Sequence, residues 1–465
     1  MHVLQDIVII LISAVIIILI CSRFKIPSVV GFLLTGMIIG PYSLGFIKDT
    51  HVIEIFAEIG ILLMMFIVGI EFSIKKLHRI RKLIIIGGGG QVILTVVATV
   101  VAAMLLGYKY DSAIFFGFLV SLSSTAIVLK LLQDRRQLDS PAGKIELGIL
   151  LFQDLCVVPM VILTPILALQ GAGEGVTDSL IKIGIAFVII NVVFFAARFL
   201  MPKVLLLIVR TRQKEIFIIA SLFICLGFAF LTDYLGLSLA LGAFIAGLII
   251  SETRYSHQVV ADILPFKESF NSLFFISIGM LLDFGFVIGN LPQVLSMGIG
   301  VFILKSFLVF SLVLLLKYPL RVAVVAGMGL AQVGEFSFIL AKLGLSYDLI
   351  SQDIFQAFLA SSIFTMIFTP FAFNLSPGAA HRIDKGKLFK PLKRLVAKQG
   401  PVNDNEDKEE LKNHVIIVGY GLNGRNLGRV LRNRKIGYVI IELNPDTVKE
   451  AAGKNEYVVY GDATR

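Results

Sequence analysis

Long apolar runs follow one another along most of this chain. From Met1 to Leu375 each run is about 18 to 25 residues long, the length that a helix needs to cross roughly 30 Å of hydrocarbon. From Pro377 onward the sequence becomes charged, which predicts a polar region outside the membrane. The runs predict about thirteen membrane-spanning helices, near residues 3–22, 27–46, 52–72, 83–106, 111–132, 145–170, 179–200, 213–232, 236–250, 268–289, 292–316, 319–342 and 353–375.

The composition supports a membrane protein. Of 465 residues, 57% are hydrophobic and 16% charged, whereas a soluble protein carries roughly a quarter charged residues. The mean hydropathy is +0.90. Cys21, Cys156 and Cys225 lie inside or at the ends of apolar runs, so they form no disulfide framework.

The basic residues predict the orientation of the chain. Most lie in one alternating set of connections between Arg23 and Arg321, while the other set holds Lys48 and Lys109, with Lys182 and Lys342 at its edges. Basic loops stay in the cytosol. We therefore expect a multi-pass protein of the cell membrane with its N-terminus outside and its C-terminal region in the cytosol. The net charge of +10 then needs no nucleic acid partner.

An internal repeat emerges when the chain is aligned with itself at an offset of about 210 residues. The matching positions are Gly31–Ile39 with Gly242–Ile250, Leu63–Gly69 with Leu273–Gly279, Gly117 with Gly327, Thr125 with Glu335, and Pro159 with Pro370. Spans one to six would match spans eight to thirteen in the opposite orientation. Two inverted six-helix repeats, 1–170 and 213–375, joined by a linker helix at 179–210, are a plan typical of secondary transporters.

Asp154 lies near the middle of the sixth run, next to Gln153. An ionisable group at this depth costs about 2.5–3.5 kcal/mol on the insertion scale, so its presence indicates a role. A carboxylate can hold a proton or a dehydrated monovalent cation but not both, which is the simplest basis for exchange. We expect Pro159, five residues later, to weaken the helix locally. The structural alternative is a protonated Asp that is hydrogen-bonded to a neighbouring helix.

Two further ionisable residues lie inside apolar runs. Lys305 needs a carboxylate partner, for which Asp154 is the candidate, unless its side chain reaches the membrane surface. Glu335 is the repeat mate of a hydroxyl cluster formed by Ser123, Ser124 and Thr125. Both clusters predict broken helices that cross and offer oxygen ligands to alkali cations. Helix packing by the serines and a structural salt bridge for Glu335 are the alternatives.

The polar tail carries a nucleotide-binding pattern. A strand-like stretch from His414 runs into a GxGxxG turn, and a second strand ends at Glu442. In this arrangement a helix N-terminus binds pyrophosphate and the acidic residue binds the ribose hydroxyls, which favours NAD(H) or an adenine nucleotide such as AMP or ATP over NADP. The candidate nucleotide-binding residues are Gly419, Gly421, Gly424, Glu442 and Asp462.

Taken in order, the motifs resemble the monovalent cation:proton antiporter-2 family and, within it, the Kef-type potassium/proton systems. The stretches that carry the resemblance are Ser123–Ile127, Phe152–Asp154 with Pro159, Lys305, Gly334–Phe336, Arg254–His257, Asp262–Lys267 and Leu273–Gly279. The resemblance implies an NhaA-like fold, a homodimer, and a core that moves against a dimerisation domain. It also implies that Asp154 carries K⁺ or Na⁺ in alternation with a proton, and electroneutrally because Gln153 is not a second carboxylate.

Two parts of the resemblance concern regulation. Gly461–Thr464 resembles RCK/KTN regulatory domains, in which the residue at Asp462 lies near the nucleotide. Where the Kef regulatory loop has acidic residues after its His, this chain has Gln258–Val260, so the resemblance does not extend to control by glutathione.

The sequence therefore predicts an all-α polytopic membrane protein with a partial α/β Rossmann-like domain. The domains are a transmembrane exchanger at 1–375, a linker at 376–412 and the N-terminal half of a nucleotide-binding domain at 413–465. We expect no enzymatic activity and no cofactor for transport. The leading rival is a ligand-gated potassium channel, but the chain has no TVGYG-type filter. A membrane oxidoreductase would need redox-centre motifs that the sequence lacks.

Overall fold

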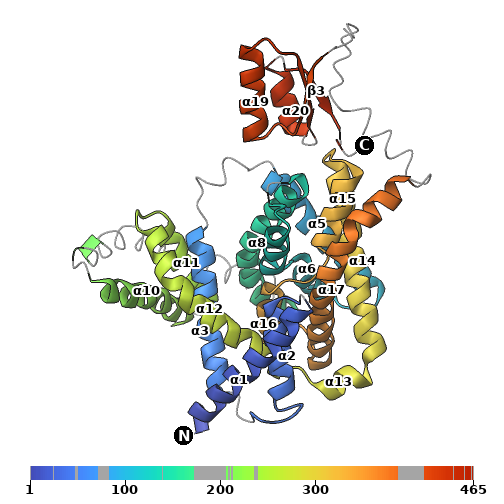
Figure 1. Cartoon of the computed structure of the whole chain (residues 1–465). Coiled ribbons are helices and arrows are strands. Elements are labelled where there is room, and N and C mark those ends of the chain that lie inside the picture. Colours follow the sequence, from blue (N-terminus) through green and yellow to red (C-terminus); the bar gives the residue numbers. More distant parts are fainter. Residues whose placement is uncertain are drawn as a thin grey trace.

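A computed structural model describes residues 2–24, 26–47, 51–71, 83–138, 140–171, 206–207, 210, 213–234, 239–385, 413–442, 445–454, 456–461 and 463. The membrane part is helical (Figure 1). Its elements are α1 (His2–Arg23), α2 (Ser28–Ile39), α3 (His51–Glu71), η1 (Leu83–Gly89), α5 (Gly90–Leu105), α6 (Tyr110–Ser121), α7 (Thr125–Asp134), α8 (Pro141–Gly171), α10 (Lys214–Tyr234), α11 (Leu239–Ser251), α12 (Ser256–Met280), α13 (Phe284–Gly289), α14 (Leu291–Leu315), α15 (Leu320–Gly329), α16 (Phe336–Ser346) and α17 (Gln352–Lys385).

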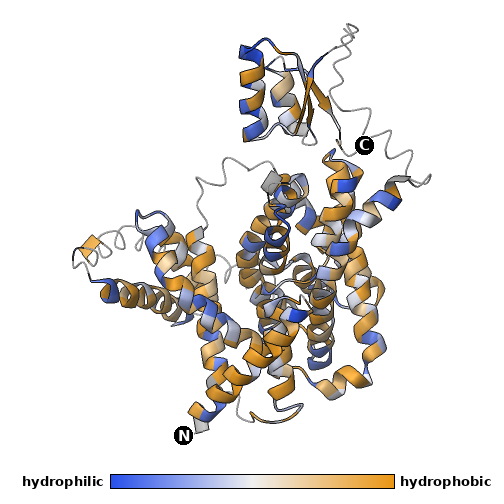
Figure 2. Cartoon of the chain, in the orientation of Figure 1, coloured by the Kyte–Doolittle hydropathy of each residue, from blue (hydrophilic) through white to orange (hydrophobic). Residues whose placement is uncertain are grey.

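The predicted class of fold is confirmed. Eight helices among the described residues are long and apolar enough to cross a membrane, and four shorter helices are also apolar. Hydrophobic residues cover most of these helices in Figure 2. Twelve of the predicted spans fall on described helices, while the span at 179–200 and most of the linker helix at 179–210 lie outside the described residues.

Two of the spans are broken in the middle. The fifth predicted span, 111–132, consists of α6 and α7 separated by residues 122–124, and the twelfth, 319–342, consists of α15 and α16 separated by residues 330–335. Both breaks fall on the polar clusters that predicted them. The half-helices leave backbone groups inside the protein that need partners.

The packing of the helices follows the internal repeat. Gly36 of α2 lies directly against the backbone of α12, and Gly279 of α12 lies against α2. The repeat mates of these glycines make the equivalent contact, because Gly69 of α3 and Gly247 of α11 lie against each other's helix. A Cβ at any of these four positions would meet backbone atoms, which explains why small residues recur at the same offset.

Several predicted boundaries were wrong. The tenth span was expected at 268–289, but α12 runs from Ser256 to Met280 and a short helix, α13, follows. His257, the last residue of the Kef-like stretch Arg254–His257, therefore lies in the first turn of α12, while Arg254 and Tyr255 precede the helix. Pro159 lies inside α8, which continues without a break to Gly171, so the expected local weakening leaves the helix intact.

Helix α17 extends beyond the predicted last span. It runs from Gln352 to Lys385, ten residues past the expected end, and contains Pro377. Because proline has no N–H, the carbonyl of Phe373 four residues earlier loses its helical donor. Arg135, just after α7, donates from Nη1 to this carbonyl at 3.3 Å and stacks on the Phe373 ring at 4.7 Å. The end of α7 is thus tied to α17.

The described part of the tail is a small α/β unit. It contains β1 (Val415–Val418), α19 (Leu422–Asn433), β2 (Tyr438–Glu442), α20 (Pro445–Ala452) and β3 (Val458–Tyr460). The strands form a parallel sheet in the order β1-β2-β3. Ile417 and Ile440 from the sheet and Leu431 from α19 form its small core. This is the predicted partial Rossmann-like domain.

Candidate functional site

The two helix breaks meet in the middle of the membrane part. The backbone N–H of Gly334 donates to the carbonyl of Leu122 at 3.1 Å, and the Ser123 hydroxyl donates to the carbonyl of Leu330 at 3.0 Å. A Cβ on Gly334 would lie 2.5 Å from the Ser123 carbonyl oxygen, so only glycine allows this approach. The crossing therefore joins the two repeats through backbone groups that the breaks left open.

Lys305 of α14 is fully buried beside this crossing. Its Nζ donates to the Leu122 carbonyl at 2.6 Å, the Gln332 carbonyl at 2.7 Å and the Ser123 hydroxyl at 2.9 Å. Three acceptors match the three N–H groups of an ammonium, whereas a neutral amine has two. Leu122 is the C-cap of α6, so the positive charge compensates the negative end of this helix dipole, while Gln332 lies in the break after α15.

The hydrogen-bond acceptors of the Lys305 Nζ are neutral oxygens. The expected pairing of Lys305 with Asp154 stays a prediction. The mid-membrane lysine has its partners in the helix breaks because carbonyls at helix C-termini are themselves partly negative.

Gln153 of α8 connects three elements. Its Oε1 accepts from the Ser123 backbone N–H at 2.7 Å, and its Nε2 donates to Gln91 Oε1 at 2.7 Å. Gln91 of α5 in turn donates to the Ser121 carbonyl at the end of α6 at 3.1 Å. This amide network fixes the break between α6 and α7 against α5 and α8, so Gln153 holds the crossing in place rather than facing an open site.

Asp154 lies one residue further on and is half-buried. The Thr125 hydroxyl is 3.2 Å from Oδ1 and 3.1 Å from Oδ2. Thr125 is the first residue of α7, and Ala126 beside it is exposed. The Asp154 carboxylate is therefore placed at the positive end of a half-helix, where an anion is stabilised, and keeps access to its surroundings.

Glu335 occupies the other side of the same helix start. It is buried, precedes the first residue of α16, and faces the Ser124 hydroxyl and the Ala126 amide of α7. Ser124 caps α7 by accepting from the Ile127 N–H at 3.3 Å. Two carboxyl groups thus flank the first turn of α7, while the ammonium of Lys305 lies at the helix ends behind it.

The structure brings together all the residues that the sequence singled out in the membrane part. Their ion- and proton-binding roles remain predictions. Sequence reasoning missed Gln91, Gln332, Thr365 and Glu146, all of them buried. Gln91 was detectable as a polar residue inside an apolar run, two residues after the η1 glycines, Gly88 and Gly89, that pack on Phe152.

In the tail, the glycine-rich turn has the predicted geometry. Gly419 has a φ of +85°, a left-handed conformation that favours glycine. Gly424 lies against the Gly419 carbonyl, so a side chain there would not fit. Glu442, at the end of β2, accepts from the Tyr420 N–H at 2.6 Å. The carboxylate therefore lies beside the turn, at the edge where a parallel sheet binds nucleotides. Asp462 lies outside the described residues.

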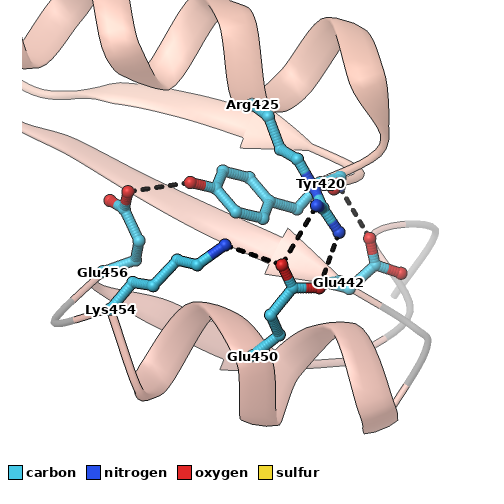
Figure 3. Close-up of polar contacts among 6 residues, drawn as sticks. All are labelled: Tyr420, Arg425, Glu442, Glu450, Lys454 and Glu456. Carbon is cyan, nitrogen blue, oxygen red and sulfur yellow. Dashed lines mark hydrogen bonds and ion pairs between the residues drawn. The ribbon is translucent and has the colours of Figure 1, made fainter.

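A charged cluster links α19 to α20 near this turn (Figure 3). Arg425 donates to both oxygens of Glu450, at 3.1 and 2.8 Å, and Lys454 donates to Glu450 at 2.7 Å. The hydrogen bond from Lys454, and then the charge of Arg425, hold the pKa of the Glu450 carboxyl below its ordinary value. Tyr420 donates to Glu456 at 2.7 Å, and burial raises the pKa of Tyr420.

Two broken helices that cross beside a half-buried carboxylate, in a bundle of apolar helices with an internal repeat, define a secondary ion transporter of the antiporter class. The chain belongs to the family of transmembrane sodium/hydrogen exchangers, whose sequence pattern matches residues 9–374. Residues 415–465 match the TrkA-N domain.

Relatives and solved structures agree with this family. The chain is 31% identical over 460 residues to the "Putative cation/proton antiporter YbaL" of Escherichia coli (strain K12), covering 97% of this chain and 81% of the relative. It is 30% identical to the glutathione-regulated potassium-efflux system protein KefC of Cronobacter sakazakii, covering 100% of this chain and 72% of the relative.

The fold is similar to that of the sodium proton antiporter MjNhaP1 from Methanocaldococcus jannaschii. The TM-score is 0.59 at 17% sequence identity, and the match covers 83% of this chain and 100% of the other. At this identity the similarity concerns the fold alone. The family is one of transporters, and the sequence-based resemblance to Kef-type antiporters is confirmed.

Proposed function

We propose that this protein exchanges K⁺ for H⁺ across the cell membrane, with Asp154 binding the two ions in alternation. The observation that carries the proposal is the position of the Asp154 carboxylate. It is half-buried, receives one hydroxyl hydrogen bond from Thr125, and lies at the positive end of α7. A carboxylate held in this way is stable without a cation, and it neutralises either a proton or a monovalent cation.

The surrounding oxygens suit a cation that has lost part of its water. The Thr125 hydroxyl and the Glu335 carboxyl lie at the same helix start as Asp154. Hydroxyl and carboxyl oxygens are ligands for hard cations such as K⁺ and Na⁺. The name of KefC, a potassium-efflux protein, favours K⁺ for this chain. The rival reading as a potassium channel is not favoured.

The test is an exchange assay in proteoliposomes with a pH-sensitive dye and K⁺ or Na⁺ outside. Wild-type protein should respond to K⁺, and Asp154→Asn should abolish the response because an amide cannot carry the proton. Asp134→Asn is the matched control, since Asp134 is exposed on the last turn of the same half-helix α7 and pairs with Lys130 at 3.3 Å. Exchange that persists in Asp154→Asn would remove the carboxylate from the mechanism.

The exchange is electroneutral under this proposal. The position before Asp154 is Gln153, whose amide is already engaged with Ser123 and Gln91. One carboxylate that carries either H⁺ or K⁺ moves the same charge in both directions. Adding valinomycin in balanced K⁺ should therefore leave the rate unchanged, and an altered rate would contradict one-for-one exchange.

The remaining features concern assembly and control. We infer a homodimer with its N-terminus outside and its C-terminal domain in the cytosol, regulated by NAD(H) or an adenine nucleotide. The Glu442 carboxylate beside the glycine-rich turn supports a nucleotide with free ribose hydroxyls. Binding of NADH, AMP and ATP to purified protein tests this, and binding equally strong in Glu442→Gln would contradict it.

A further inference from the structure

A third acidic side chain lies inside the membrane part, besides Asp154 and Glu335, and takes no part in the site described above. Glu146 is in the N-terminal half of α8, about two turns before Asp154. Its side chain is 0% exposed. Both of its carboxyl oxygens lack a hydrogen-bond partner among the described residues. A buried carboxyl that is wholly unpartnered is rare in proteins and calls for an explanation.

The surroundings of Glu146 are apolar. Ile145, Ile149 and Leu150 of α8 belong to a buried cluster that also contains Ala326 of α15 and Val309 of α14. An ionised carboxylate in such a place would be an uncompensated buried charge, which proteins avoid. The neutral carboxylic acid is therefore the form that this packing accommodates.

The other neighbour of Glu146 is the crossing itself. A Cβ on Gly329 would lie 2.7 Å from Glu146 Oε1, so the carboxyl fills the space that this glycine leaves. Gly329 is the last residue of α15, and the next residue, Leu330, accepts the hydrogen bond from Ser123. A change in the charge or position of Glu146 therefore acts on the backbone directly before the break.

The elements packed against α8 offer Glu146 no charged partner. They are η1, α6, α7, α11, α15 and α16, and the buried cluster around Glu146 adds α14 and α17. Lys305 of α14 donates to the Leu122 and Gln332 carbonyls and to Ser123. The ionisable residues of α17 lie at its two ends and are Asp353, His381, Arg382, Asp384 and Lys385. Helices η1 and α11 have no ionisable side chain. The ionisable side chains on the other four are Tyr110, Asp111, Lys130, Asp134, Arg321 and Lys342, and Glu335 precedes α16. None of them donates to the Glu146 carboxyl.

We propose that Glu146 is a second proton-binding site, separate from Asp154, which holds a proton in the conformation described here and exchanges it with the cytosolic side. The step is a simple protonation. One carboxylate oxygen takes a proton from a hydronium ion and forms an O–H bond, which leaves a water molecule, and on release the same bond breaks and the proton returns to water. The proposal deepens the proposed antiport, because it gives the exchanger a dependence on cytosolic pH that the ion-carrying carboxylate does not itself provide.

Loss of this proton would place a negative charge against Gly329 without a donor to receive it. We expect the ionised form to favour a conformation in which Glu146 is hydrated, and so to slow exchange at alkaline cytosolic pH. Glu146→Gln keeps the neutral shape at every pH. Its exchange should therefore persist to a higher pH than that of the wild type. If proton affinity differs tenfold between the two conformations, ionisation of Glu146 shifts their equilibrium by at most about tenfold, which sets the slowing expected in the wild type.

Infrared difference spectroscopy tests the proton directly, without using transport. Purified wild-type protein should show the high-frequency C=O stretch of a carboxylic acid that makes no hydrogen bond. This band should vanish in Glu146→Gln and in Glu146→Met, whose apolar side chain suits the buried cluster. It should remain in Glu268→Gln, the same change at a side chain that is 64% exposed. A band that survives both Glu146 variants would overturn the proposal.

Exchange measured at a series of internal pH values gives the second test. If the exchange rate of Glu146→Gln declines at the same alkaline pH as that of the wild type, or at a lower pH, the proposal is also overturned. The two proposals fail differently. Exchange retained in Asp154→Asn refutes the antiport mechanism, whereas an infrared band and pH profile unaffected by Glu146→Gln refute only the second proton site.

Discussion

Replacing Lys305 by methionine tests whether the buried ammonium holds the crossing together. Methionine has a similar length and fills the same space, so little cavity forms. The change removes the donor to the carbonyls of Leu122 and Gln332, which lie 2.6 and 2.7 Å from Nζ. The Leu122 carbonyl keeps the Gly334 N–H as a donor, so the Gln332 carbonyl is the group that loses its partner. A buried group left without its partner costs about 1–3 kcal/mol.

The expected result is a measurable loss of thermal stability with little change in expression of the chain. For a protein of this size, each kcal/mol lowers the midpoint by about 2 °C, so we expect a fall of about 2–6 °C. The measurement is the temperature at which the detergent-purified protein loses its monodisperse peak in size-exclusion chromatography. Exchange activity should also fall, because the first turn of α7 depends on the same crossing.

Lys342→Met is the matched control for this experiment. Lys342 lies on α16, the half-helix that follows the second break, and its Nζ is 4.0 Å from Glu58 in an ion pair whose side chains are 35% and 54% exposed. Exposed pairs contribute about 0–1 kcal/mol, so the control should shift the midpoint little. If both lysine variants lower the midpoint equally, the ammonium of Lys305 does not stabilise the helix breaks and the reasoning fails.

Three further predictions follow from the site and the tail. Thr125→Val removes the hydroxyl that donates to Asp154. It should raise the K⁺ concentration for half-maximal exchange about tenfold, since one such hydrogen bond contributes about 1 kcal/mol or slightly more. An unchanged concentration would show that the hydroxyl has no part in ion binding. Gly334→Ala places a Cβ 2.5 Å from the Ser123 carbonyl oxygen and should destabilise the protein by about 1–3 kcal/mol. Thermal unfolding measures this loss. Gly300→Ala is the control, because a Cβ there meets nothing within 4 Å. The hydrogen bond from Lys454 lowers the pKa of the Glu450 carboxyl. The stabilising effect of this bond is therefore fully present above the ordinary pKa of a glutamate and is lost as the pH falls through the lowered pKa. Limited proteolysis of the tail should accelerate over that acidic range in the wild type, and Glu450→Gln should show no such acid-dependent step.

Hydropathy was sufficient to predict the class of fold, because the membrane requires long apolar helices and leaves few alternatives. It was also sufficient to place the two helix breaks, since hydroxyl and glycine clusters interrupt otherwise uniform apolar runs. It failed at α12. This helix contains Lys267 and Glu268 well before its end, and charged residues in a helix that packs against other helices are indistinguishable from a loop when only the sequence is considered.

The residues of the site could be predicted from the sequence, but the hydrogen bonds between them could not. Asp154, Lys305 and the hydroxyl cluster were identified because polar groups are costly in the membrane. The partner of Lys305 could not be deduced, since its acceptors are mainly backbone carbonyls, and a carbonyl has no signature in the sequence. Glu146 was missed because it lies at the predicted edge of a span, where a carboxylate is ordinarily hydrated.

Helix α17 has a mechanical consequence for an exchanger with a domain attached to its end. Its 34 residues form a rod about 50 Å long. Near its middle the Thr365 hydroxyl accepts from the Val333 N–H inside the second break, at 3.3 Å. Pro377 would otherwise weaken the helix at this point, but Arg135, which follows the C-terminal end of α7, donates to the Phe373 carbonyl that the proline leaves without a helical donor. A rotation of α17 applied at Lys385 therefore acts on the end of α7 and on the second helix break, without any ligand having to enter the membrane.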